Sequence, residues 1–266
     1  MARRRHAAAS SLLANCAGIV IFVFLALPIL VIVFSAFSPT AFPEVPPSGF
    51  SLVWFQEVFA SRGWMRAIQT SLFLLLIVTP ITVILGTFAA YGLRRLQGRF
   101  SSLLQSFIMS PLMVPQIVLG IALLYVFSAV GVNGSLWTMA LGQCVVALPY
   151  VVRCVNASMA GFNVRLEDAS MSLGAKAGYT FRHVTMPLIR PGIVAGAVFA
   201  AVTSFGEVSI SLFLSSAANT PVSVRIFNYI EQTFDPAVTA VSVIFIVVSI
   251  VVLVVLDRTV GLAKAM

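Results

Sequence analysis

Long apolar stretches without charged residues alternate with short polar segments along the chain. A helix needs about 20 mostly apolar residues to cross the hydrocarbon core of a bilayer, and several stretches have that length. Residues 100–152 carry no charge, and the turn sequence Gly-Val-Asn-Gly-Ser at residues 131–135 divides them into two spans. The pattern predicts an all-α membrane protein with six transmembrane helices in one domain, residues 1–266. The predicted spans are residues 17–37, 67–93, 103–130, 136–155, 188–214 and 236–256.

The composition supports this pattern. The chain has 266 residues, of which 60% are hydrophobic and 9% are charged, and this balance lies outside the range of soluble globular domains. The first apolar stretch exceeds the roughly 7–15 residues of a signal-peptide core, so we expect an uncleaved first span. The three cysteines fall in or beside predicted spans, which favours packing over disulfide formation.

The basic residues are unevenly distributed between the two sides that six spans create. Of the 16 Lys and Arg residues, 13 fall at the termini or in the segments that follow the second and fourth spans. Cytoplasmic loops carry an excess of Lys and Arg, so both termini and the polar segment 157–187 are predicted to be cytoplasmic. The net charge of +8 is spread over short loops between spans, which argues against a nucleic-acid partner.

Signatures of enzymes are missing from the sequence. No Gly-rich loop of the form G-x-x-x-x-G-K-[ST] is present, so the chain is not expected to hydrolyse ATP itself. Neither H-E-x-x-H nor G-x-S-x-G occurs, and His6 and His183 are the only histidines. We therefore expect a non-enzymatic chain that holds no cofactor or metal of its own.

The segment 157–187 is the most polar part of the chain between its first and last spans. We predict a short helix over residues 163–173, a turn at Gly174 and a second short helix over residues 175–185, with Pro187 beginning the return to the membrane. Apolar side chains presented beside acids and bases on so small an element favour docking on a protein over a solvated loop. The apolar side chains are Met171, Leu173, Phe181 and Val184.

The spacing within this elbow resembles the cytoplasmic signature of permease subunits of binding-protein-dependent ABC importers. That signature reads Glu-Ala-Ala, three residues, Gly, nine residues and Ile-x-Leu-Pro. Here Asp-Ala-Ser begins at Asp168, Gly174 follows after three residues, and Val-Thr-Met-Pro begins nine residues later. Glu167 adds a second acid, so the spacing leaves open which carboxylate acts. The implied docking residues are Glu167, Asp168, Ala169, Ser170, Gly174, Val184, Met186 and Pro187.

The resemblance implies the six-helix fold of MetI-like, type I importer permeases in a bacterial cytoplasmic (inner) membrane. In that family the elbow is a coupling helix that sits in a cleft of an ATP-hydrolysing subunit. The expected partners are a second, related permease subunit, two ATPase subunits that hold ATP and Mg, and an extracytoplasmic solute-binding protein. Membrane lipid would surround the spans.

Further segments resemble the spermidine/putrescine branch of these permeases. That branch commonly carries Asp before the Glu of the fifth span, where this chain has Gly206. The implied cargo is a polyamine, with an aminophosphonate, a sulfate-like anion or iron as alternatives. A stand-alone secondary transporter or channel is the alternative from another class, although neither a coupling-ion site nor inverted repeats are evident. The similar segments are residues 50–55, 111–117, 204–207 and 227–230.

The fifth predicted span contains one acid, Glu207, within the membrane. Small residues that recur every four positions precede it and form a face that another helix can approach closely, and Glu207 is expected to continue this face one turn later. A carboxylate in the membrane should face protein or water, so we predict that this face lines the translocation path or meets a partner helix. The alternative is a Glu near the outer interface that reaches headgroup water. The small residues are Gly192, Gly196, Ala200 and Ser204, and the predicted path residues are Glu207, Ser204, Thr203 and Ser211.

Overall fold

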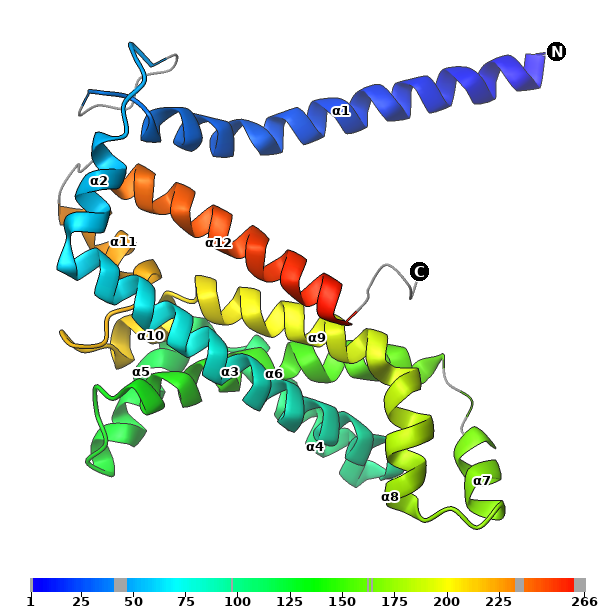
Figure 1. The fold of residues 1–266 in the computed structure, drawn as a ribbon. Coiled ribbons are helices and arrows are strands. Elements are labelled where there is room, and N and C mark those ends of the chain that lie inside the picture. The colour runs from blue at the N-terminus through cyan, green and yellow to red at the C-terminus, as the bar shows by residue number, and fades with distance from the viewer. Residues whose placement is uncertain are drawn as a thin grey trace. The chain divides into compact units, whose positions relative to one another are not determined.

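The computed structural model describes residues 2–40, 47–96, 98–161, 163, 165–232 and 237–260. Residues 162 and 164 of the predicted elbow, residue 236 of the last predicted span, and Lys264 lie outside the described residues, as do the side chains of residues 2–14. The described elements are all helical (Figure 1). They are α1 (Ala2–Ala36), α2 (Val53–Ala60), α3 (Arg62–Arg95), α4 (Arg99–Met109), η1 (Ser110–Leu112), α5 (Gln116–Ala129), α6 (Leu136–Ala160), α7 (Arg165–Ser172), α8 (Ala177–Thr180), η2 (Phe181–Thr185), α9 (Met186–Gly206), α10 (Ser209–Leu214), α11 (Val222–Gln232) and α12 (Ala237–Val260).

The chain divides into two compact units. The first comprises Met1–Arg62 and Tyr229–Val247, and the second comprises Gly63–Asn228 and Val248–Met266. In the first unit, Phe37 packs on the ring of Phe55 with centroids 5.1 Å apart, and the Trp54 indole donates a hydrogen bond to the Ser38 carbonyl oxygen over 2.8 Å. These contacts join the end of α1 to α2.

Helix α6 forms the centre of the second unit, and α9 packs along it. The close approach depends on the small face of α9, because a Cβ at Gly192 would lie 2.6 Å from the Cys154 carbonyl oxygen and one at Gly196 would lie 3.0 Å from the Val151 side chain. The prediction that small residues let another helix approach is therefore confirmed. The helix they meet is α6 of the same chain.

Within the described ranges, five helices are long and apolar enough to cross a membrane, and a sixth span results if one bent pair counts as a single span. The bent pair corresponds to the predicted span 103–130, which is therefore not one continuous helix: Arg99–Leu112 and Gln116–Ala129 meet at 103°. Pro115 has no N–H to continue the helix and disfavours helical backbone at the residue before it. The chain therefore turns before α5 begins.

The predicted span 188–214 is also interrupted. Helix α9 ends at Gly206, and Glu207 has extended backbone, with φ −72° and ψ 120°, before α10 begins at Ser209. The expectation that Glu207 continues the α9 face by one further turn is therefore wrong. The Glu207 side chain can accept hydrogen bonds from the first free N–H groups of α10, and this favours starting a new helix over continuing α9.

The second helix of the elbow runs into the membrane without a break. Residues Ala177–Gly206 form one stretch of 30 residues, in which η2 is a π-helical segment. Pro187 lies inside this continuous stretch and does not separate the elbow from the membrane helix; it lies just after the π-helical segment. The wider π turn accommodates the local change in hydrogen bonding.

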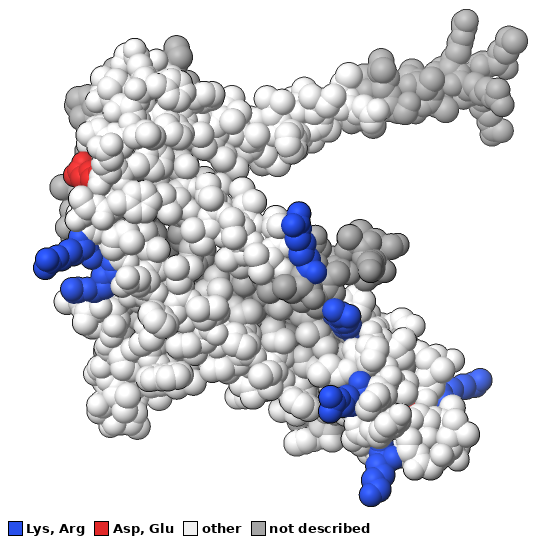
Figure 2. Space-filling model, in the orientation of Figure 1, with Lys and Arg blue, Asp and Glu red and all other residues white. Residues whose placement is uncertain are grey.

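The basic side chains give the elbow a polar surface. On the face shown in Figure 2, Lys and Arg side chains gather on and beside the elbow at the lower right, while the neighbouring apolar helices are largely white. Lys176 and Arg182 are exposed on the elbow itself. The side of the membrane on which this surface lies stays a prediction.

Candidate functional site

Helix α7 is the first arm of the elbow and starts on a polar cap. The Asn163 side-chain oxygen accepts a hydrogen bond from the Arg165 backbone N–H over 3.1 Å, which satisfies one of the free donors at the helix start. Glu167 and Asp168 fall in the first turn, where the helix dipole favours negative charge. The local sequence thus places two adjacent acids at the same helix end.

Gly174 ends this arm as predicted. Its φ of +89° lies in the left-handed region that glycine adopts without a Cβ penalty. The Gly174 N–H donates to the Met171 carbonyl oxygen over 2.9 Å, and the Ala175 N–H donates to that of Ser170 over 3.2 Å. This pair of bonds is the Schellman closure of a helix C-terminus, and it produces the tight turn between α7 and α8.

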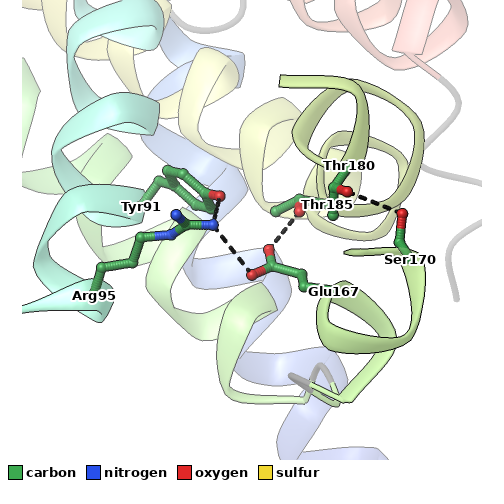
Figure 3. A network of polar contacts seen from close by, with 6 residues as sticks. All are labelled: Tyr91, Arg95, Glu167, Ser170, Thr180 and Thr185. Carbon is green, nitrogen blue, oxygen red and sulfur yellow. Dashed lines mark hydrogen bonds and ion pairs between the residues drawn. The ribbon is translucent and has the colours of Figure 1, made fainter. Parts of the chain in front are cut away.

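Glu167 points into the protein (Figure 3). Its side chain is 10% exposed, and its Oε1 accepts a short hydrogen bond from the Thr185 hydroxyl. Its Oε2 lies 3.5 Å from an Arg95 guanidinium nitrogen. One carboxylate therefore joins α7 to the last residue of η2 and to the last residue of α3.

Aromatic rings surround the Arg95 end of this network. The Arg95 guanidinium lies over the Tyr91 ring, 4.5 Å from its centroid, and donates a short hydrogen bond to the Tyr91 hydroxyl. The Tyr91 ring in turn meets that of Phe181 with centroids 4.7 Å apart, and Phe88 stacks on Phe181 at 5.7 Å. The elbow therefore contacts α3 through both apolar rings and charged groups.

Asp168 lies on the outside of the same helix turn and is exposed. Beyond it, the turn carries a pocket of approximately 490 Å³ lined by Ser170, Leu173, Gly174, Ala175, Lys176 and Tyr179. The Leu173 side chain is 90% exposed. A base and an exposed leucine line this pocket, and an exposed acid lies on the same helix arm; together they form a surface suited to contact with a protein.

The other docking residues implied by the spacing divide between surface and interior. Ala169, Met186 and Pro187 are exposed, and Val184 is half-buried. Ser170 instead links the two arms, because its hydroxyl lies 2.9 Å from that of Thr180 (Figure 3).

A second polar cluster lies at the far end of α9. The Glu207 carboxylate, with the residue 5% exposed, accepts hydrogen bonds from the backbone N–H groups of Ile210 over 2.9 Å and Ser211 over 2.8 Å. The Ser211 hydroxyl donates a third over 3.0 Å. Glu207 thus fixes the break between α9 and α10, and it is enclosed by its own chain rather than open to headgroup water.

Gln143 of α6 connects this cluster to the core. Its side-chain oxygen accepts from the Ser204 hydroxyl over 2.7 Å, and its amide donates to the Ser211 hydroxyl over 2.9 Å. Three of the four predicted path residues, Ser204, Glu207 and Ser211, are therefore brought together, whereas Thr203 is half-buried and takes no part in these bonds. Their role in a path stays a prediction.

Sequence reasoning missed several participants. No motif marks Thr185 or Gln143, although Thr185 occupies the variable position of the spacing and Gln143 is a large amide within an uncharged apolar run. The sequence marks Arg95 only as one of the bases that follow the second predicted span. Within the described ranges, no group of three or more His, Cys, Asp and Glu side chains could hold a metal ion.

Comparison with known proteins places this architecture. Residues 82–261 match the family described as "binding-protein-dependent transport system inner membrane component". The chain is 27% identical to the spermidine/putrescine transport system permease protein PotC of Haemophilus influenzae, over 91% of this chain and 94% of that protein. It is 33% identical to the molybdenum transport system permease protein ModB of Mycobacterium bovis, over 65% of this chain and 71% of that one.

A solved structure supports the fold. A chain in the crystal structure of a bacterial ABC transporter involved in the import of the acidic polysaccharide alginate is similar with a TM-score of 0.73, covering 92% of this chain and 95% of that chain at 15% identity. At this identity the likeness establishes the arrangement of the helices. The predicted importer-permease fold is thereby confirmed, apart from the interrupted helices described above.

Proposed function

This chain belongs to the family of binding-protein-dependent transport system inner membrane components, and from that premise we propose how it is driven and what it carries. As a permease subunit of an ABC importer, it provides membrane helices and not the ATP-hydrolysing machinery. The drive would come from two ATPase subunits that hold ATP and Mg, and the solute from an extracytoplasmic binding protein. A second, related permease chain would complete the path.

The observation that supports this proposal is the outward half of the elbow. Asp168 and Lys176 supply opposite charges, and Leu173 supplies an apolar side chain that no part of the described chain covers. Such a surface is unfavourable in water unless a protein partner buries it. In this proposal Asp168 pairs with a base on the ATPase, and the elbow and both termini face the cytoplasm of a bacterium.

The proposed cargo is a polyamine. The similarity to PotC spans nearly the whole chain, and Glu207 is a carboxylate within a membrane span. Because Glu207 is nearly enclosed, it would attract a cation through its field across apolar surroundings, where screening is weak, rather than by direct contact. Ser204, Thr203 and Ser211 would lie near the same part of the path.

A second candidate cargo is an anion. The identity to ModB is higher than that to PotC but covers a shorter part of the chain. The same architecture would serve a sulfate-like anion or an aminophosphonate. Iron is the remaining alternative. A secondary transporter or channel would need no ATPase, so dependence on ATP separates that class from the proposal.

Uptake into proteoliposomes tests both parts. The permease pair, the ATPase and the binding protein are reconstituted, and labelled spermidine, molybdate or 2-aminoethylphosphonate is supplied with and without ATP inside. We expect ATP-dependent uptake of spermidine, competed by putrescine and not by the two anions. Uptake of an anion alone would overturn the cargo, and uptake without ATP would overturn the importer mechanism.

The docking assignment has its own test. Asp168→Lys reverses the exposed charge without altering a buried group, so the ATPase should no longer co-purify while the permease still inserts. Arg182→Asp, a charge reversal at another exposed elbow residue, serves as the matched control for charge alone. Retention of the ATPase by Asp168→Lys would show that Asp168 does not contact it.

A further inference from the structure

We infer that Glu167 and Arg95 form a latch that makes α3 move together with the elbow. The elbow would then drive two membrane helices, α9 through the continuous chain and α3 through the latch. This inference rests on the proposed function, because the movement would begin in a docked ATPase. It assigns the inward acid a task that differs from docking.

The need for a latch follows from the connectivity. Helix α9 is the direct continuation of the elbow, since Ala177–Gly206 is one helical stretch. Helix α3 is separated from the elbow by α4, α5 and α6 along the chain, so only side-chain contacts can carry force to it. Some of these are ring contacts of Phe181 with Phe88 and Tyr91, and apolar contacts have no fixed direction.

The Glu167 carboxylate supplies the direction that ring contacts lack. It is bonded to Thr185 on one oxygen and faces Arg95 at 3.5 Å with the other, so a shift of either arm of the elbow acts on the end of α3 (Figure 3). The carboxylate side chain is 10% exposed, which limits screening of its charge, while the Arg95 side chain is 49% exposed.

Contacts with Tyr91 hold the Arg95 guanidinium in the orientation that faces Glu167. The guanidinium is held over the Tyr91 ring at 4.5 Å and bonded to the Tyr91 hydroxyl. Both residues lie on the same helix, one turn apart, so the guanidinium is oriented by α3 itself. The charge thus moves with α3, and the elbow holds α3 whenever Glu167 stays in place.

The two adjacent acids then have separate tasks. Asp168 is exposed on the docking surface, whereas Glu167 is turned inward. Neutralising Glu167 should leave the ATPase bound and α9 moving but release α3. Neutralising Asp168 should instead weaken ATPase binding. The same chemical change at neighbouring positions therefore gives opposite results.

Spin labels on the two helices test this without knowledge of the cargo. In the complete importer with its native cysteines replaced, one label is placed at Phe73 of α3 and, separately, one at Val202 of α9, both exposed positions. The probe is ATP with vanadate, and the readouts are the change in each label's spectrum and the ATPase retained on purification. Glu167→Gln is compared with Asp168→Asn.

We expect both labels to respond in the unmodified chain. In Glu167→Gln the Val202 label should respond as before, and the response at Phe73 should fall about fivefold, as expected for the loss of one coupled pair. Arg95→Met, which leaves Glu167 bonded to Thr185, should behave in the same way. The exchanged pair Arg95→Glu with Glu167→Arg should restore part of the Phe73 response, which a purely structural role of either residue would not do.

An unchanged Phe73 response in both Glu167→Gln and Arg95→Met would overturn the latch. Loss of the ATPase in Glu167→Gln but not in Asp168→Asn would also overturn it, because Glu167 would then be the docking acid. Absence of any response in the unmodified complex, with no ATPase retained, would instead contradict the proposed function. The two failures are therefore distinguishable.

Discussion

Each end of α9 is held by a buried glutamate, but the two carboxylates find their partners at very different distances along the chain. At the far end, Glu207 bonds to residues three and four positions ahead of it, Ile210 and Ser211. At the elbow end, Glu167 bonds to Thr185, eighteen positions away, and faces Arg95 of another helix. A carboxylate satisfied locally can hold a fixed shape, whereas one satisfied by distant elements can link their movements.

This comparison predicts which glutamate matters for stability and which for motion. The Glu207 bonds form within one helix break, and the residue is 5% exposed. Those of Glu167 lie between three elements beside an exposed surface. Substitutions should therefore act on the folded structure at one end of α9 and on coupling at the other.

The largest effect is expected for Glu207→Gln. In the native protein the backbone N–H groups of Ile210 and Ser211 each donate to one carboxylate oxygen of Glu207. The glutamine amide would replace one of these oxygens by an NH2 donor and leave one N–H without an acceptor, and a buried unpaired donor costs about 1–3 kcal/mol. We expect a lower apparent melting temperature in detergent, together with slower uptake of a cationic solute. The exposed Glu57→Gln is the matched control and should leave both unchanged.

A different outcome at Glu207 would revise the comparison. If Glu207→Gln slowed cationic uptake at an unchanged melting temperature, the carboxylate would act on the cargo and not on the helix break. If neither quantity changed, Glu207 would have no part in the path, and the polyamine proposal would rest on similarity alone.

A smaller effect is expected at the turn of the elbow. A Cβ at Gly174 or at Gly178 would meet no atom within 4 Å, but only Gly174 has a left-handed φ, at +89°. Gly174→Ala should therefore cost about 1 kcal/mol, whereas Gly178→Ala should be neutral or slightly stabilising within its helix. Melting of the detergent-solubilised protein measures both changes, and co-purification of the ATPase shows whether the strained elbow still docks.

Equal melting temperatures of Gly174→Ala and Gly178→Ala would mean that the backbone at residue 174 can change conformation without a measurable cost. The bulkier Gly174→Val then decides whether docking needs the tight turn. Uptake and ATPase binding that survive this substitution would contradict the assignment of the turn to the interface.

The smallest effect is expected for Gln143→Leu. Loss of the Gln143 amide removes one hydrogen-bond partner from Ser204 and one from Ser211. Ser211 keeps its bond to Glu207, and the Ser204 hydroxyl can donate to a backbone carbonyl of its own helix instead. The cost should stay below about 1 kcal/mol. Gln116→Leu, at an exposed position of α5, is the control for added apolar surface. A loss as large as that of Glu207→Gln would show that the break depends on α6 and is not locally held.

The same division by distance explains what could be predicted from the sequence. The uninterrupted spans, the elbow and the turn at Gly174 follow from local rules of length, apolarity and glycine conformation, whereas the breaks within residues 103–130 and 188–214 do not. Pro111 and Pro115 favour a kink before α5, but a proline alone does not determine a bend as large as 103°. The partners of Glu167 and Ser204 on other helices could not be predicted, because no local pattern pairs Glu167 with Arg95 or Ser204 with Gln143.

The π-helical segment Phe181–Thr185 has a consequence for how the elbow faces its surroundings. A π turn holds an additional residue compared with an α turn, and each residue of an α-helix advances the side-chain direction by about 100°. Removing one residue here would rotate the docking surface by about that angle around the axis of α9. The direction in which the docking surface faces therefore depends on the number of residues in this segment. For this reason a spacing of nine residues can identify the elbow even where the residue types have changed.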